Sequence, residues 1–157
     1  MTGKDYADRI ASYVSMRFGA RGVKVYREVQ VGKSIIGKNR RIDVFCVREA
    51  SNTAFAIECK FQDSEGTVDE KIPYALDDLA ALPMAGCIAY GGKGFSQGVL
   101  HMLEGAPSAA YCLPTVGQSA QSPQTWELDH LLAIHFQWWD VLVGTRSCVQ
   151  TGFITDI

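Results

Sequence analysis

This 157-residue sequence has no apolar run close to the roughly 18 residues that a membrane span requires, so we expect no membrane partner. Its N-terminus also lacks the apolar segment of a secretory signal and carries Lys4, Asp5, Asp8 and Arg9 instead. The five cysteines are odd in number, scattered and never spaced as C-x-x-C, which argues against a zinc site. Three of them lie in apolar strand-like runs. This pattern predicts buried, reduced thiols in a cytoplasmic protein.

The sequence also lacks an excess of basic residues over acidic ones. Lysine and arginine number 15 against 17 acids, and the net charge is −2. Binding of nucleic acid usually shows as excess positive charge, so the total is a mild argument against such a partner. Residues 33–41 nevertheless contain four cations and no acid, which allows a local positive loop. The apolar fraction of 47% and charged fraction of 20% indicate an ordinary globular domain.

Two short apolar runs dominate what the sequence does contain. Residues 40–47 and 53–62 are rich in β-branched and aromatic residues and are separated by a short turn-like segment. This arrangement predicts an antiparallel hairpin. Because side chains alternate along a strand, Glu58, Lys60 and Gln62 share one face while four apolar side chains share the other.

An aspartate on the first of these strands, Asp43, can lie level with Glu58 across the hairpin. Two neighbouring carboxylates repel each other unless a cation lies between them, and a hard divalent ion such as Mg²⁺ prefers oxygen ligands. We therefore interpret this stretch as the active site. The alternative is an ordinary surface ion pair between Glu58 and Lys60, against which the apolar opposite face and the companion Asp43 argue.

These residues carry a family resemblance. Asp43, fourteen intervening residues and then Glu58-Cys59-Lys60 resemble the signature of the PD-(D/E)XK nuclease superfamily. The resemblance covers about residues 5–104, and Ile42 stands where the family's name places proline. It implies the restriction-endonuclease-like fold and metal-dependent hydrolysis of phosphodiester bonds, with DNA as the expected substrate and endonuclease activity favoured over exonuclease activity.

The resemblance also implies a role for each residue of the motif. Asp43 and Glu58 would bind one or two Mg²⁺ ions, for which Mn²⁺ can substitute, and the backbone carbonyl of Cys59 would be a further ligand. Lys60 would orient or help to deprotonate the attacking water. Gln62 would orient the lysine, the water or a phosphate oxygen.

An acid of the first helix often completes the metal site in this family, and Asp8 is the candidate here. Residues 5–18 have apolar side chains at helical spacing, with Asp5 and Asp8 in or next to the first turn. A favourable interaction with the helix dipole is the alternative explanation for both acids.

The element order helix, strand, strand, strand, helix, strand, helix predicts an α/β fold with a mixed central sheet flanked by helices. We expect one domain over residues 1–157, with a nuclease-like core over about 5–104 and a C-terminal helical extension over about 105–157. Residues 105–123 look mostly irregular, and the tail from residue 141 could supply a last strand or two. The other expected elements are strands over residues 23–31 and 86–90 and helices over about 70–82, 96–103 and 126–139.

Two details concern the helix over about residues 70–82. Thr67 and Glu70 have the spacing of a helix capping box. Pro73 would remove a hydrogen bond inside a helix, so the helix either begins near Ile72 or is kinked at the proline.

Several cations and one tyrosine are candidates for contact with a phosphate backbone. For each of them, simple solvation is the alternative. Nucleic acid, and DNA in particular, is the expected partner, and a two-fold homodimer would suit cleavage of both strands. The candidates are Lys33, Lys38, Arg40, Arg41, Lys71, Tyr74 and Lys93.

Two other functions compete with a nuclease. A catalytically silent nucleic-acid-binding or assembly module could keep the same fold, since fold does not guarantee activity. The glycine-rich loop from Gly91 to Gly94 could bind a nucleotide, although it departs from the P-loop pattern, and a tight turn is the simpler interpretation. DNA repair, recombination, phage DNA processing and restriction all remain open as pathways.

Overall fold

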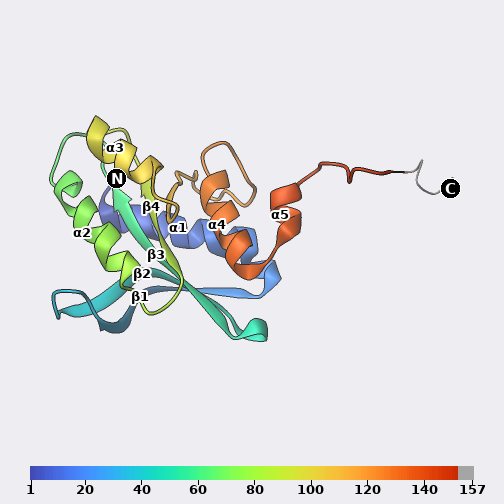
Figure 1. Cartoon of the computed structure of the whole chain (residues 1–157), viewed down its shortest axis with the longest axis horizontal. Helices are drawn as coiled ribbons and strands as arrows, with labels where there is room; N and C mark the ends of the chain where they lie inside the picture. Colours follow the sequence, from blue (N-terminus) through green and yellow to red (C-terminus); the bar gives the residue numbers. More distant parts are fainter. Residues whose placement is uncertain (152–157) are drawn as a thin grey trace.

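A computed structural model describes residues 1–151 and centres on a five-stranded mixed sheet in the order β1-β2-β3-β4-β5 (Figure 1). The first three strands are antiparallel neighbours, while β3, β4 and β5 run parallel. The strands are β1 Val23–Lys33, β2 Asn39–Arg48, β3 Thr53–Phe61, β4 Gly86–Gly91 and β5 Ala109–Tyr111.

Helices cover both faces of the sheet. The larger core cluster joins α1, α4 and α5 to one face, and the smaller cluster joins α2 and α3 to the other. Within the described residues, no helix is long and apolar enough to cross a membrane. The helices are α1 Gly3–Phe18, α2 Val68–Ala80, α3 Gln97–Glu104, α4 Trp126–Phe136 and α5 Trp139–Val143.

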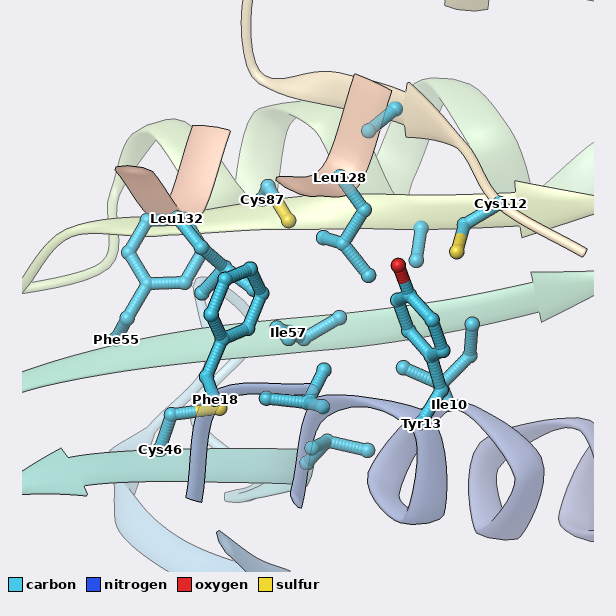
Figure 2. Packing of buried hydrophobic residues seen from close by; sticks show 14 of the residues in the cluster. Ile10, Tyr13, Phe18, Cys46, Phe55, Ile57, Cys87, Cys112, Leu128 and Leu132 are labelled. Carbon is cyan, nitrogen blue, oxygen red and sulfur yellow. The ribbon is translucent and has the colours of Figure 1, made fainter. Parts of the chain in front are cut away.

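The larger core lies between α1, the sheet and α4 (Figure 2). Phe18, Ile57, Leu128 and Leu132 are almost completely buried there. Each such side chain contributes about 1.5–3 kcal/mol of transfer free energy. Cys46, Cys87 and Cys112 lie buried and unpaired in the same cluster, and the half-buried thiol of Cys59 packs against it.

The smaller core fixes which face of the sheet carries the polar motif. Ile88 and Tyr90 of β4 belong to the cluster under α2 and α3, and they are the register partners of Glu58 and Lys60 on β3. Neighbouring residues of parallel strands point to the same side, so Glu58 and Lys60 lie on the α2 side of the sheet. Ile57 lies on the opposite side, in the larger core.

The expected fold is confirmed, with differences in the C-terminal third. Three residues of the segment expected to be irregular form β5, which pairs with β4. The helix expected over residues 126–139 ends at Phe136, because Gln137 adopts the left-handed conformation with φ 63°, and the short α5 follows. No strand forms over residues 141–151, and residues 152–157, where part of the tail prediction falls, lie outside the described part of the chain.

The start of α2 also differs from expectation. The helix begins at Val68, so Pro73 lies inside it and the expected start near Ile72 is wrong. Thr67 has helical backbone angles and makes no side-chain capping bond, so the predicted capping box is wrong as well. Instead, the side-chain oxygen of Gln62 accepts the N–H of Asp69 at 3.3 Å and serves one of the free donors of the first turn.

Candidate active site

The motif lies where β2 and β3 stop pairing. The last register pair of their ladder is Val44 with Ile57. Beyond it, β2 continues to pair with β1, and β3 continues to pair with β4 as far as Phe61. Asp43 and Glu58 are the next residues along the two strands, so both carboxylates occupy the point at which the backbone ladder ends.

Two contacts fix Asp43 at this point. Its Oδ2 accepts the backbone N–H of Cys59 at 2.8 Å, so the carboxylate satisfies a donor on β3 that the strand ladder leaves free. The guanidinium of Arg27 on β1 donates to the backbone carbonyl of Asp43. The side chain and the backbone of Asp43 are therefore held by different strands.

The residue opposite Asp43 on β1 has an unusual backbone conformation. The register pairs Arg27 with Val44 and Val29 with Ile42 place Glu28 across from Asp43. Glu28 has φ 56°, in the left-handed region that residues other than glycine rarely adopt. Such a conformation costs about 1–2 kcal/mol, so backbone strain is located beside the proposed metal ligand.

Electrostatics at Glu58 show how closely the two acids interact. Burial, followed by the neighbouring Asp43 carboxylate, raises the pKa of Glu58 to about 8, and the Lys60 ammonium acts in the opposite direction. Without a cation, this pair therefore holds a proton at neutral pH.

A divalent cation fits this donor set. It would neutralise both carboxylates, and their oxygens are the hard ligands that Mg²⁺ and Mn²⁺ prefer. Within residues 1–151, no three His, Cys, Asp or Glu side chains gather as a metal cluster. Mg²⁺ is commonly bound by one or two carboxylates together with water and substrate phosphate oxygens.

Lys60 is half-buried on the same face as Glu58. Its positive charge lowers the pKa of Glu58 and also contributes to the lowered pKa of Asp78 on α2. The ammonium therefore lies near acids on two sides, where it can act on a group bound at the carboxylate pair.

Asp78 is a site residue that sequence reasoning missed. It accepts hydrogen bonds from Arg40 at 2.8 and 3.3 Å and from the backbone N–H of Ile35 at 3.1 Å. The Arg40 hydrogen bonds, as the largest cause, lower the pKa of Asp78. Continuing the helical spacing from Lys71 and Tyr74 would have reached Asp78, because three and then four residues separate them on α2.

Arg40 requires a correction. It was expected to contact a phosphate backbone, but it is only 6% exposed and its guanidinium is engaged by Asp78. The other hairpin cations, Lys33, Lys38 and Arg41, are exposed. Lysine and arginine in a loop look alike in the sequence, and only the fold shows which of them is buried.

The two candidates on α2 differ from Arg40. Lys71 and Tyr74 are both exposed, and they share one side of α2 with Asp78. The structure therefore brings these two candidates to the side of the helix that contacts the β1–β2 hairpin.

Gln62 is buried, with 5% exposure, just beyond the end of β3. Its amide nitrogen donates to Asp69 at 3.1 Å and to the carbonyl of Gly94 at 2.8 Å. These bonds tie together the end of β3, the start of α2 and the loop after β4. Gln62 therefore holds the loops beside the motif, and the structure does not pair it with Lys60.

The glycine-rich loop packs against the protein itself. A Cβ atom at Gly92 would lie 2.2 Å from the carbonyl oxygen of Gln62, and one at Gly94 would lie 2.4 Å from the nitrogen of Ser64. The N–H of Gly94 donates to the carbonyl of Gln62 at 2.8 Å. Close backbone packing accounts for these glycines, and this observation argues against the nucleotide-binding alternative. Lys93 is exposed and lines a hollow of about 720 Å³ whose lining does not include the carboxylate pair.

Asp8 reaches the site only indirectly. Its carboxylate accepts a hydrogen bond from Arg27 at 2.8 Å, and Arg27 in turn contacts the carbonyl of Asp43. Asp8 does not form a three-acid cluster with Asp43 and Glu58 in the described chain. The structure thus places Asp8 behind an arginine that the sequence analysis did not single out.

Comparison with known protein families gives a match that covers most of the chain. A family model described as a PD-(D/E)XK nuclease superfamily domain matches residues 2–139. The chain belongs to this superfamily. The resemblance seen in the sequence is confirmed, and the mixed sheet flanked by helices is consistent with the restriction-endonuclease-like fold of PD-(D/E)XK proteins. Membership supports a nuclease-type function.

Two solved structures show weak likeness to this PD-(D/E)XK chain. A protein of unknown function, AF1548, has a TM-score of 0.40 and 16% identity, over 62% of this chain and 53% of its own. A repair endonuclease from Pyrococcus abyssi has a TM-score of 0.36 and 17% identity, over 62% of this chain and 42% of its own. The matched part therefore spans about half of those structures or less. No curated protein matches the chain in sequence.

Proposed function

We propose that this chain is a Mg²⁺-dependent endonuclease that hydrolyses phosphodiester bonds of DNA, in repair, recombination, phage DNA processing or restriction. The observation that carries the proposal is the Asp43–Glu58 pair beside Lys60 at the end of the β2–β3 ladder. Membership of the PD-(D/E)XK superfamily supports the same chemistry.

In this proposal, Asp43, Glu58 and the backbone carbonyl of Cys59 hold the metal. A bound divalent ion supplies charge neutralisation at the scissile phosphate and lowers the pKa of water. Lys60 orients the attacking water and stabilises the negative charge that develops on the phosphate. Arg27 is a positioning residue, since it holds the backbone of Asp43 from β1.

The DNA backbone would lie along two exposed features near this site. Lys33, Lys38 and Arg41 are exposed on the β1–β2 hairpin, and Lys71 and Tyr74 are exposed on α2. Contacts from these side chains to phosphates position the substrate without reading its sequence. The proposal therefore predicts binding that weakens steeply with salt, and little sequence preference.

The experiment is cleavage of a panel of linear, nicked, single-stranded and branched DNA and of RNA, with Mg²⁺, Mn²⁺ or EDTA. We expect metal-dependent cleavage of DNA by the wild type and by Lys4→Ala, a control at an exposed position of α1. Lys60→Ala should lose about 10³-fold in rate while unfolding at the same temperature.

Two results would speak against the proposal. Full activity in Lys60→Ala would remove the lysine from the site. DNA binding without cleavage under every condition would favour the catalytically silent module.

A further inference from the structure

The turn between β1 and β2 has a defined shape. The N–H of Gly37 donates to the carbonyl of Ser34 at 2.9 Å, and the N–H of Ser34 donates to the carbonyl of Lys38 at 2.7 Å. Gly37 has φ 78°, a conformation that glycine adopts without strain. Ile35 and Ile36 are therefore the two central residues of a closed turn.

These two isoleucines are unusual at such a position. Turn tips favour Gly, Pro, Asn, Asp and Ser, because these residues suit turn backbones and water. Ile35 and Ile36 are instead 49% and 60% exposed. Single exposed apolar residues are common, but two adjacent β-branched residues at the end of a hairpin make its tip apolar and exposed to water.

The charges around this tip indicate which partner it fits. Lys33, Lys38 and Arg41 are exposed on either side of it, and residues 29–42 contain no acid. Four of the chain's 15 lysines and arginines lie within residues 33–41, although the chain as a whole has a net charge of −2. An apolar tip flanked by cations matches a polyanion with an apolar interior, which describes stacked bases between phosphate backbones.

The tip is also held in place beside the active site. Asp78 of α2 accepts the N–H of Ile35 and both donors of Arg40. Figure 1 shows the β1–β2 connection at one edge of the molecule, beside α2. Arg40, which Asp78 holds, lies on β2 three residues before Asp43. A rigid connection of this kind would set the tip at a constant position relative to the proposed cleavage site.

We propose that Ile35 and Ile36 form a wedge that inserts between stacked bases of a DNA duplex and opens the helix next to the scissile phosphate. This inference rests on the proposed function, and it names the substrate form that the site would prefer. Inserting an apolar side chain at a base step requires unstacking, which costs a few kcal/mol and least where stacking is already broken. Nicked, mismatched or branched duplexes are therefore favoured over intact ones.

The test uses duplexes that carry 2-aminopurine, whose fluorescence rises when the base unstacks, and the Lys60→Ala chain so that the DNA stays intact. We expect this chain to raise the fluorescence at a nick or branch. The double substitution Ile35→Ser with Ile36→Ser should abolish the rise and weaken duplex binding about tenfold, because two apolar contacts are lost. The salt dependence of binding should stay the same, since no cation is removed.

Ile134→Ser is the matched control, because Ile134 is 52% exposed on α4. It should leave both the fluorescence and the affinity unchanged. Thermal unfolding should place all variants close to the parent, as expected for exposed positions.

Several outcomes would overturn the wedge. These are an undiminished fluorescence rise in the double variant, no rise with the parent chain, and loss of self-association or of binding to anionic vesicles as the main effect of the substitution. Failure of the proposed function looks different, because it appears as absence of metal-dependent cleavage by the chain with Lys60 intact, whatever the 2-aminopurine signal.

Discussion

The two ends of the β2–β3 strand pair are built in different ways. From Val44 to Arg48, β2 pairs regularly with β3, and the adjoining side chains Phe55 and Ile57 are buried in the larger core. Beyond Val44, toward Asp43, β2 and β3 no longer pair through their backbones, and a side-chain contact joins them instead. Asp43 binds the N–H of Cys59. One end thus consists of backbone bonds and apolar packing, and the other of charged side chains.

The difference shows where stability and chemistry are separated in this fold. The paired end satisfies its backbone within the sheet and excludes water. The open end holds a partly buried acid pair and a left-handed residue, Glu28, both of which disfavour the folded state. Groups of this kind tend to persist where function requires them. Substitutions at the two ends should therefore have opposite effects on activity and stability.

The largest expected effect is loss of cleavage at the open end. Asp43→Ala and Glu58→Ala should each lower the rate of DNA cleavage about 10³-fold or more, because the metal ligands are removed. Both chains should still unfold cooperatively in a thermal melt followed by circular dichroism. A variant that retains full metal-dependent cleavage would remove its residue from the site.

Substitution at the paired end should lower stability and leave DNA cleavage nearly unchanged. Phe55 is 4% exposed, and Phe55→Ala should lower the free energy of unfolding by about 3 kcal/mol through the cavity that it leaves. Denaturant titration measures the loss. The cleavage rate, measured well below the melting temperature, should stay within a few-fold of the wild type, and a loss as large as that of Asp43→Ala would contradict the separation of the two ends.

Removing the ion pair that joins the β1–β2 hairpin to α2 should have an intermediate effect on stability. Asp78→Ala leaves Arg40 buried without its partner and should cost about 2 kcal/mol in unfolding free energy. Asp77→Ala is the control, because Asp77 is exposed next to it. If both variants were equally stable, Asp78 would not be holding the hairpin.

Protonation of Glu58 should make the stability of the folded chain depend on pH at the open end. The folded-state pKa of Glu58, about 8, lies above its ordinary value of 4.5, so between these values the folded chain keeps a proton that the unfolded chain releases. Stability in EDTA should therefore fall as pH rises through this window. Glu58→Gln keeps the neutral form, so it should be more stable than the wild type above pH 8 and match it below about pH 4.5.

His135 supplies the contrast at the paired end, where its ring lies 5.0 Å from that of Phe55. Burial lowers the pKa of His135 below 6.5, so its contribution to stability is present above the unfolded value and is lost as pH falls. Denaturant titrations in EDTA at several pH values measure both effects. Equal pH dependence of the wild type and Glu58→Gln would show that Glu58 is not perturbed.

The smallest expected effect concerns backbone strain. Glu28→Gly should raise the unfolding free energy by up to about 1 kcal/mol, because glycine adopts φ 56° without the Cβ clash. Glu65→Gly, in the exposed loop after β3, is a control without positive φ. A destabilised Glu28→Gly chain would indicate that the Glu28 side chain, and not its strain, matters at this position.

Periodicity along the chain was enough to predict the three antiparallel strands, the strand at residues 86–90 and the first helix. The motif from Asp43 to Lys60 could also be placed on adjoining strands, because alternation assigns each side chain to a face. The short strand β5 and the helix end at Gln137 carry no such signal. β5 has three residues that rely on β4 for pairing, and Gln137 turns left-handed without the glycine that usually marks a helix end.

Partners across the chain were the main source of error at the site. Arg40 was expected to contact a phosphate backbone, and Gln62 to orient the lysine, the water or a phosphate oxygen, yet the fold gives each a protein partner from α2. Arg27 and Asp78 were missed for the same reason, since a charged residue on a strand or helix looks solvated until the opposing element is known. Long-range pairing of polar groups is thus the part of this site that local pattern does not reveal.

The most direct test of the open end is metal binding without catalysis. Electron paramagnetic resonance of Mn²⁺ in the presence of the wild type, Asp43→Ala, Glu58→Ala and the control Asp77→Ala would count bound ions. We predict saturable binding by the wild type and Asp77→Ala that competing Mg²⁺ reverses, and at least tenfold weaker binding by the other two chains. Equal Mn²⁺ binding by all four chains, or none by the wild type, would contradict a metal site at Asp43 and Glu58.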